Sequence, residues 1–347
     1  MNRRTFLESA AVAAGGLLAG AGNVLGSKEG KLGEDAEVMT VAGARPAADL
    51  GFVLPHEHVL VDFIGADKIS PDRYEQEDVI RVVTPYLNQA KSLGCETLVE
   101  CTPDFLGRDP VLLKRLTEIT GLHFLTNTGF YGAAKDKFIP AHAYEASVDQ
   151  LADAWTREWE EGIDKSEVRP GFMKIGVDNG PLSDIDKKLV RAAARTHLKT
   201  GLTIAVHTGP GLPAMEELAV LAEEGVHPSA WIWVHAQSEK DTEYHVRAAE
   251  QGAWIEFDGV GPNTLDRHVE LVVEMKRHGH LDQVLISHDA GWFRPGEPDG
   301  GAFRGFDTVF NQFLPALKKK GLTDIEVDRL THLNPQRAYT IGIRALN

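Results

Sequence analysis

Short apolar runs alternate with longer amphipathic stretches from residue 50 onward. The runs are too uniformly apolar for strands with one face in water, which indicates a parallel sheet that is covered on both sides. Eight runs fit this description, at residues 52–54, 97–99, 123–125, 172–175, 203–206, 231–234, 254–257 and 284–286. We therefore expect eight buried strands.

The stretches between these runs have helical periodicity. Clear examples cover residues 78–93, 143–162, 184–200, 215–224, 242–251 and 265–278. Glycines such as Gly121 and Gly201 stand just before a strand, where a helix ends. Eight strand-helix units in about 300 residues predict an α/β fold, a (β/α)8 TIM-type barrel that forms a single domain over residues 36–347. An open doubly wound sheet would need a glycine-rich phosphate turn after its first strand, and that turn reads Pro55-His56-Glu57-His58 here.

Composition and net charge limit the kinds of partner that the protein can bind. Of 347 residues, 43% are hydrophobic, and the formal net charge is −15. Such acidity argues against nucleic acid and anionic membranes, which both require basic patches. The two cysteines, Cys95 and Cys101, would lie roughly 20 Å apart on one strand, too far for a disulfide.

The first residues have a separate character. Arg3 and Arg4 precede an apolar run over residues 10–25 that is too short and too rich in alanine and glycine for a membrane span. The pattern predicts a twin-arginine-type export signal and linker over residues 1–35, and hence a periplasmic or secreted protein. Because the run is not followed by a cysteine, we expect no lipid membrane anchor. A flexible terminus with a chance arginine pair is the alternative.

Polar residues fall at the carboxyl ends of the predicted strands. His56 and His58 end the first strand, two apart and therefore on one face. The other positions are His207 on the fifth strand, His235 on the sixth and Asp289 on the eighth. Active sites of barrels form at this rim. A single histidine there is usually a core residue, but four histidines and an aspartate predict a metal site of zinc or manganese type.

Lys174 interrupts the apolar fourth strand. An ammonium group facing the barrel interior is costly unless it is neutralised or used. Carbamylation by carbon dioxide would make it a carboxylate that can bridge two cations. A lysine that extends to the rim is the alternative for this residue taken alone.

These motifs together resemble the phosphotriesterase family of the amidohydrolase superfamily, which includes phosphotriesterase-like lactonases. The resemblance extends from about residue 38 to residue 337. It rests on the segments Pro55-His56-Glu57-His58, Phe172-Met173-Lys174-Ile175, Val206-His207-Thr208, Val234-His235 and Ser287-His288-Asp289. It also includes Gly107-Arg108-Asp109, Thr128-Gly129-Phe130-Tyr131 and Asn334-Pro335-Gln336-Arg337.

The resemblance implies a binuclear centre that holds two divalent metal ions, with zinc the expected metal. His56, His58 and Asp289 would hold the more buried ion, and His207 and His235 the more exposed one. Carbamylated Lys174 and a hydroxide would bridge them. Two cations lower the pKa of bound water, and Asp289 would accept the proton as general base.

The family resemblance specifies the substrate less closely than it specifies the metal ligands. Tyr131 follows the third strand where lactonase-like members also have a tyrosine, and we nominate it as a catalytic and substrate contact. Trp292 and Phe293, in a long connection over residues 290–305, are expected to form a wall over the site. Asp258 matches the family, but Gly259 replaces the basic residue that usually follows. The acidic residue expected shortly after His235 is also missing.

The leading hypothesis is a metal-dependent hydrolase whose substrate is a small-molecule ester, lactone or phosphotriester. The resemblance is also compatible with a homodimer. A mononuclear deaminase of the same superfamily is one alternative, although a single metal does not need a bridging lysine. A metal-bearing binding protein without turnover is the other.

Overall fold

The computed structural model describes Gly33 and residues 35–346. The predicted export signal lies outside the described residues. The residues from Glu34 to Asn347 form one compact unit, to which the following description applies. Its strands are β1 (Glu37–Thr40), β2 (Gly43–Pro46), β3 (Phe52–Leu60), β4 (Cys95–Glu100), β5 (His123–Leu125), β6 (Asn127–Thr128), β7 (Phe172–Gly176), β8 (Ile204–His207), β9 (Trp231–Val234), β10 (Trp254–Phe257), β11 (Val284–Ile286) and β12 (Gly291–Phe293). Its α-helices are α1 (Gln76–Ser92), α2 (Pro110–Thr120), α3 (Ala141–Glu145), α4 (Val148–Glu161), α5 (Asp184–Thr200), α6 (Gly211–Glu223), α7 (Thr242–Glu250), α8 (Leu265–Arg277), α9 (Leu314–Lys319), α10 (Asp324–Asp328) and α11 (Asn334–Tyr339).

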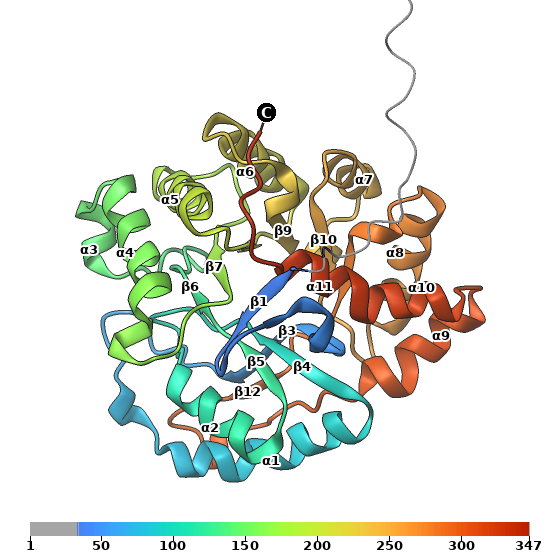
Figure 1. Ribbon diagram of the computed structural model, residues 1–347, viewed down its shortest axis with the longest axis horizontal. Coiled ribbons are helices and arrows are strands. Elements are labelled where there is room, and N and C mark those ends of the chain that lie inside the picture. The colour runs from blue at the N-terminus through green and yellow to red at the C-terminus, as the bar shows by residue number, and fades with distance from the viewer. Residues whose placement is uncertain (1–32, 34, 347) are drawn as a thin grey trace, which may run out of the picture. The chain divides into compact units, whose positions relative to one another are not determined.

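The strands form the (β/α)8 barrel that the sequence predicts. Parallel pairing runs in the order β11-β10-β9-β8-β7-β6 and in the order β12-β3-β4-β5. Only Thr126 separates β5 from β6, so these two are one interrupted barrel strand, as are β11 and β12 around residues 287–290. Figure 1 shows the strands at the centre and helices α1 to α8 around them. All eight predicted strands are confirmed.

Local signals explain where the helices begin and end. Gly121 and Gly201 end α2 and α5 in the left-handed conformation, which glycine adopts at little steric cost. The prediction of a single helix over residues 143–162 is wrong, because this segment contains parts of two helices, α3 and α4. Ser147 and Gln150 form a capping box that starts α4 anew.

The C-terminal segment covers the end of the barrel where the strands begin. The Thr203 hydroxyl, just before β8, donates to the Ala338 carbonyl at 2.6 Å, and the Arg344 guanidinium donates to the Thr203 hydroxyl at 2.9 Å. The Gly342 amide donates to the Gly201 carbonyl at 3.1 Å. The opposite end, where the strands finish, is therefore the end available for a site.

Glu217 is a residue of α6 whose side-chain carboxylate is fully buried. It accepts hydrogen bonds from the Thr208 hydroxyl at 2.8 Å and from the Trp231 indole at 2.9 Å. Burial raises the pKa of Glu217 well above its ordinary value, despite these two donors.

We predict that Glu217→Gln flattens the pH dependence of stability. The folded pKa of Glu217 is raised, so its contribution is fully present below the unfolded value and is lost as pH rises through the folded one. Thermal melts of wild type and variant between pH 5 and pH 9 measure this. The variant should lose less stability than wild type toward high pH, and parallel curves would contradict the assignment.

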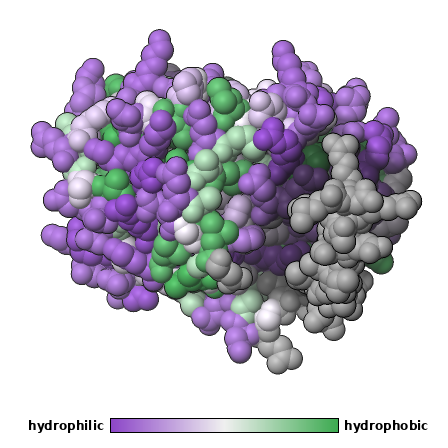
Figure 2. All heavy atoms as spheres, turned by 90° about the horizontal axis from the view of Figure 1, so that it is seen from above, coloured by the Kyte–Doolittle hydropathy of each residue, from purple (hydrophilic) through white to green (hydrophobic). Residues whose placement is uncertain are grey.

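The face of the molecule shown in Figure 2 is mostly hydrophilic, with a narrower hydrophobic band across it. Within the described residues, every helix is too short or too polar to span a membrane. Cys95 and Cys101 are both buried and unpaired.

Candidate metal centre

The six predicted ligands meet at one cavity at the carboxyl ends of the strands. His56 and His58 come from β3, Lys174 from β7 and His207 from β8. His235 directly follows β9, and Asp289 follows β11. All six line a cavity of about 80 Å³. The six residues belong to or directly follow five different barrel strands, so closure of the barrel brings them together.

One group of ligands is tightly packed. His56, His58 and Asp289 each offer a ligand atom, and these atoms lie within 4.8 Å of one another. The Asp289 Oδ1 atom is 3.2 Å from His58 Nε2 and 3.8 Å from His56 Nε2. Lys174 Nζ lies 3.5 Å from His56 Nε2 and is 2% exposed. Lys174 is therefore a neighbour of the ligands and does not extend to solvent.

Three histidines are oriented through their Nδ1 atoms. His56 Nδ1 is 3.0 Å from a Glu256 oxygen and 3.2 Å from an Asp258 oxygen. His58 Nδ1 is 2.8 Å from the Thr102 hydroxyl, and His235 Nδ1 is 2.7 Å from Asp258. Partners at Nδ1 leave the Nε2 atoms as ligand atoms, an arrangement that recurs around protein-bound metals.

The second pair of histidines lies toward Tyr131. The ring centroids of His207 and His235 are 4.3 Å apart. The Tyr131 hydroxyl lies 2.9 Å from His207 Nδ1. Burial, with Asp289 and Asp178 nearby, raises the pKa of Tyr131 far above neutrality. Tyr131 therefore keeps its proton at neutral pH.

Asp289 and His58 are in the ionisation states that metal binding requires, whereas His56 is not. Burial would raise the pKa of Asp289, but His58, His56 and His235 outweigh it and hold that pKa below its ordinary value. Burial lowers the pKa of His58 to about 4, against the opposing influence of Asp289. Burial and Lys174 act to lower the pKa of His56, but Asp258 and Glu256 dominate and raise it to about 10. The proton on His56 would therefore have to leave before its Nε2 atom could bind a cation.

The residues present fit divalent cations. Imidazole nitrogens and a carboxylate oxygen are the donors that zinc-like ions prefer. Three buried carboxylates, Glu100, Glu256 and Asp258, lie just behind the histidines. Glu256 Oε1 is buried without a hydrogen-bond partner among the described residues. Bound cations would stabilise the ionised forms of these buried carboxylates.

Two of the predicted substrate contacts do not line the cavity. Asp258 is fully buried and accepts hydrogen bonds from the His235 amide at 2.9 Å and from the Gln237 side chain at 2.7 Å, so it orients ligands. Phe293 is 5% exposed and packs in the main hydrophobic core. Trp292, in contrast, lines the cavity with its ring 5.8 Å from that of His58.

Several residues of the site were missed from the sequence. Glu256 supports His56, and Thr102 supports His58. Glu100 accepts from the Thr102 hydroxyl at 2.6 Å, and burial raises its pKa to about 7. Glu256 could have been found, because it interrupts the apolar run Trp254–Phe257 as Lys174 interrupts its own strand. Thr102 carries no comparable signal.

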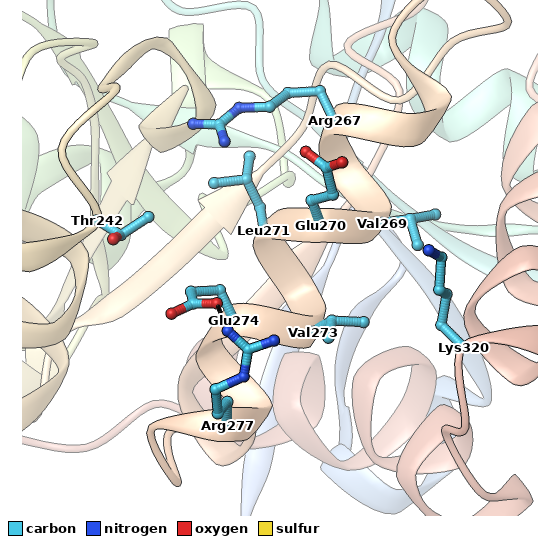
Figure 3. A pocket seen from close by; sticks show the side chains of 9 residues that line it. All are labelled: Thr242, Arg267, Val269, Glu270, Leu271, Val273, Glu274, Arg277 and Lys320. Atoms are coloured by element: carbon cyan, nitrogen blue, oxygen red, sulfur yellow. Dashed lines mark hydrogen bonds and ion pairs between the residues drawn. The ribbon is translucent and has the colours of Figure 1, made fainter.

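A larger hollow of about 430 Å³ lies along α8, away from this site (Figure 3). Three of its charged side chains have partners, since Arg277 pairs with Glu274 and Arg267 donates to the Glu239 carbonyl. Its lining side chains include no histidine or cysteine. It therefore offers no second metal centre.

The chain is therefore a (β/α)8-barrel protein with a histidine-rich, carboxylate-supported cluster at its strand ends. The family model of the phosphotriesterase family matches residues 36–339, and the chain belongs to this family. It is 27% identical over 293 residues to the phosphotriesterase homology protein of Escherichia coli, covering 83% of this chain and 98% of that protein. It is 26% identical over 303 residues to the aryldialkylphosphatase of Saccharolobus solfataricus, covering 84% and 96%.

The fold is also similar to solved structures. A lactonase engineered for organophosphate hydrolysis from a weak, promiscuous template matches with a TM-score of 0.80 at 26% identity. The match covers 87% of this chain and 99% of that one. The family and its structural neighbours are hydrolases, and the phosphotriesterase-family membership predicted from the sequence is confirmed.

Proposed function

We propose that this chain is a binuclear metal-dependent hydrolase of esters, lactones or phosphotriesters. The observation that carries the proposal is the convergence of four histidines, Lys174 and Asp289 on one cavity at the strand ends. Asp289 and Lys174 lie next to the same His56 nitrogen, as a shared ligand set requires. A mononuclear deaminase would not need the buried lysine.

Two divalent cations held there would lower the pKa of a water molecule and polarise the scissile C=O or P=O bond. In this proposal His56, His58 and Asp289 hold one cation, and His207 and His235 hold the other. The Lys174 amine adds carbon dioxide, forming an N–C bond with loss of a proton, and so becomes a carboxylate. Asp289, ionised at neutral pH, accepts a proton during the attack.

The cavity favours a neutral substrate with a compact apolar group. Val61, Leu106 and Phe138 form a small hydrophobic cluster beside it, against which Tyr131 and Trp292 pack. Among the described residues that line the cavity, Lys174 is the sole lysine or arginine. An anionic leaving group or acyl group that points away from the proposed cations would therefore lose its hydration without gaining a cationic side chain as partner.

Trp292 offers both apolar surface and a hydrogen-bond donor. Its indole nitrogen is buried without a hydrogen-bond partner among the described residues. A buried indole N–H normally finds a partner, and in the cavity wall a substrate oxygen can provide one.

We predict that Trp292→Phe lowers kcat/KM about 10-fold, since it keeps an apolar ring and removes one hydrogen bond. Steady-state hydrolysis of a neutral lactone measures the effect. Trp159→Phe, a matched change in α4 away from the cavity, should retain wild-type kcat/KM. Equal values for all three proteins would remove Trp292 from the substrate site.

The proposed function is tested with the zinc-loaded protein. The panel contains neutral lactones, aryl esters, a chromogenic phosphotriester and amino-substituted heterocycles. Hydrolysis of at least one ester class is the expected result. Release of ammonia from the heterocycles alone would favour the deaminase, and binding without turnover would favour the metal-bearing binding protein.

A further inference from the structure

Glu57 lies between two proposed ligands, His56 and His58, on β3. Because successive side chains of a strand point to opposite faces, its carboxylate is turned away from the face that carries these histidines. Glu57 is 1% exposed and is not among the residues that line the cavity. The reaction proposed above leaves this buried charge without a role.

The carboxylate of Glu57 is surrounded by donors from the chain that carries Asp289. Its Oε1 atom accepts from the Ser287 hydroxyl at 2.7 Å and from the His288 amide at 3.0 Å. Its Oε2 atom accepts from the Ala290 amide at 2.9 Å. One carboxylate thus holds the residues on both sides of Asp289.

His288 strengthens this arrangement. The Val309 amide, at the start of the π-helix Val309–Phe313, donates to His288 Nε2 at 2.9 Å. That nitrogen must therefore be unprotonated, and the ring proton is on Nδ1, which donates to Glu57 Oε1 at 2.6 Å. Glu57 consequently accepts four hydrogen bonds from residues 287–290.

The backbone of Asp289 needs such support. Its φ angle is 52°, in the left-handed region that is sterically unfavourable for residues other than glycine. A residue persists there only where the surrounding contacts impose the conformation. The Asp289 amide also donates to the His56 carbonyl at 3.1 Å, so β3 fixes Asp289 through both a main-chain and a side-chain group.

We propose that Glu57 is a positioning residue that holds the Ser287-His288-Asp289-Ala290 segment so that the Asp289 carboxylate meets the ligand histidines. The inference rests on the proposed metal centre for its consequence, but the contacts of Glu57 exist without it. Partners that orient metal ligands affect affinity nearly as strongly as the ligands themselves. Glu57 therefore sets metal affinity without contacting the metal.

The test compares Glu57→Gln with Glu217→Gln, a second buried glutamate that accepts hydrogen bonds from Thr208 and Trp231. A glutamine amide would turn an NH2 group toward an N–H or O–H donor of residues 287–290. Hydrogen exchange of the full chain should be faster at residues 288–291 in Glu57→Gln. It should equal that of wild type there in Glu217→Gln.

The consequence is measured as zinc affinity by competition with a chelator. Glu57→Gln should bind zinc about 10- to 100-fold more weakly than wild type. If Glu57→Gln fails to fold, Ser287→Ala replaces it, with an expected weakening of about 3-fold for the loss of one hydrogen bond. Wild-type exchange at residues 288–291, or wild-type zinc affinity, in the folded variant would overturn the inference. Absence of zinc from the wild type would instead reject the proposed function, and exchange would still decide the role of Glu57.

Discussion

Lys174→Ala is expected to lose both metal ions and about 10⁴-fold in kcat/KM. Losses of this size are typical when one residue is removed from a set of catalytic residues that act together. Lys174 is buried, and its Nζ atom lies 3.5 Å from His56 Nε2. Alanine removes the group that the proposal places between the two cations. The barrel should remain folded, because a buried ammonium contributes little to stability. Elemental analysis and steady-state kinetics measure the two losses.

Two further variants test whether the loss is specific to the side chain at position 174. Lys174→Glu supplies a shorter carboxylate at the same position and should recover part of the metal content. Lys188→Ala removes a lysine that donates to backbone carbonyls of residues 143, 144 and 146, far from the cavity, and should keep both metals. Full metal content in Lys174→Ala would disprove the bridging role.

Asp289→Asn is expected to reduce kcat/KM about 10³-fold, within the range for losing a general base. The amide is nearly isosteric with the carboxylate, so the contacts of Ser287, His288 and Ala290 with Glu57 should survive. The change removes the negative charge next to His58 and His56 and the site that accepts a proton. Metal affinity should fall together with the rate.

The matched control is Asp178→Asn. Asp178 accepts a hydrogen bond from the Lys135 amide at 3.1 Å and does not line the cavity. Its variant should retain the wild-type rate, which separates a local effect at Asp289 from a general loss of negative charge. An Asp289→Asn protein with wild-type turnover would require another base.

The strand order and the six proposed ligands could be predicted because both follow from simple periodicity. His56 and His58 share a face of β3, and parallel strands bring their carboxyl ends to one rim. Lys174 stood out because a charged residue inside an apolar run has few structural explanations.

Phe293 shows where periodicity stops being informative. Asp289, between β11 and β12, has a φ angle of 52°, and Trp292, within β12, has a φ angle of 77°. Each left-handed residue turns the chain, so the alternation of an extended strand no longer tells which side a side chain faces. Trp292 consequently lines the cavity while Phe293 enters the core. The division of residues 143–162 into two helices was visible in Ser147 and Gln150, but helical periodicity continues across that point.

The roles of Asp258 and Glu57 depended on contacts between segments distant in the sequence. Asp258 reaches both His56 and His235, and Glu57 reaches residues more than 200 positions away. Such pairs are set by the register of neighbouring strands, which no local pattern encodes.

The central claim is that this cavity holds two metal ions bridged by Lys174. A crystal structure of the zinc-loaded protein, with anomalous scattering recorded at the zinc edge, tests it most directly. We expect two anomalous peaks, one beside His56, His58 and Asp289 and one beside His207 and His235, with added density on Lys174 Nζ between them. A single peak, or two peaks with an unmodified Lys174, would contradict it.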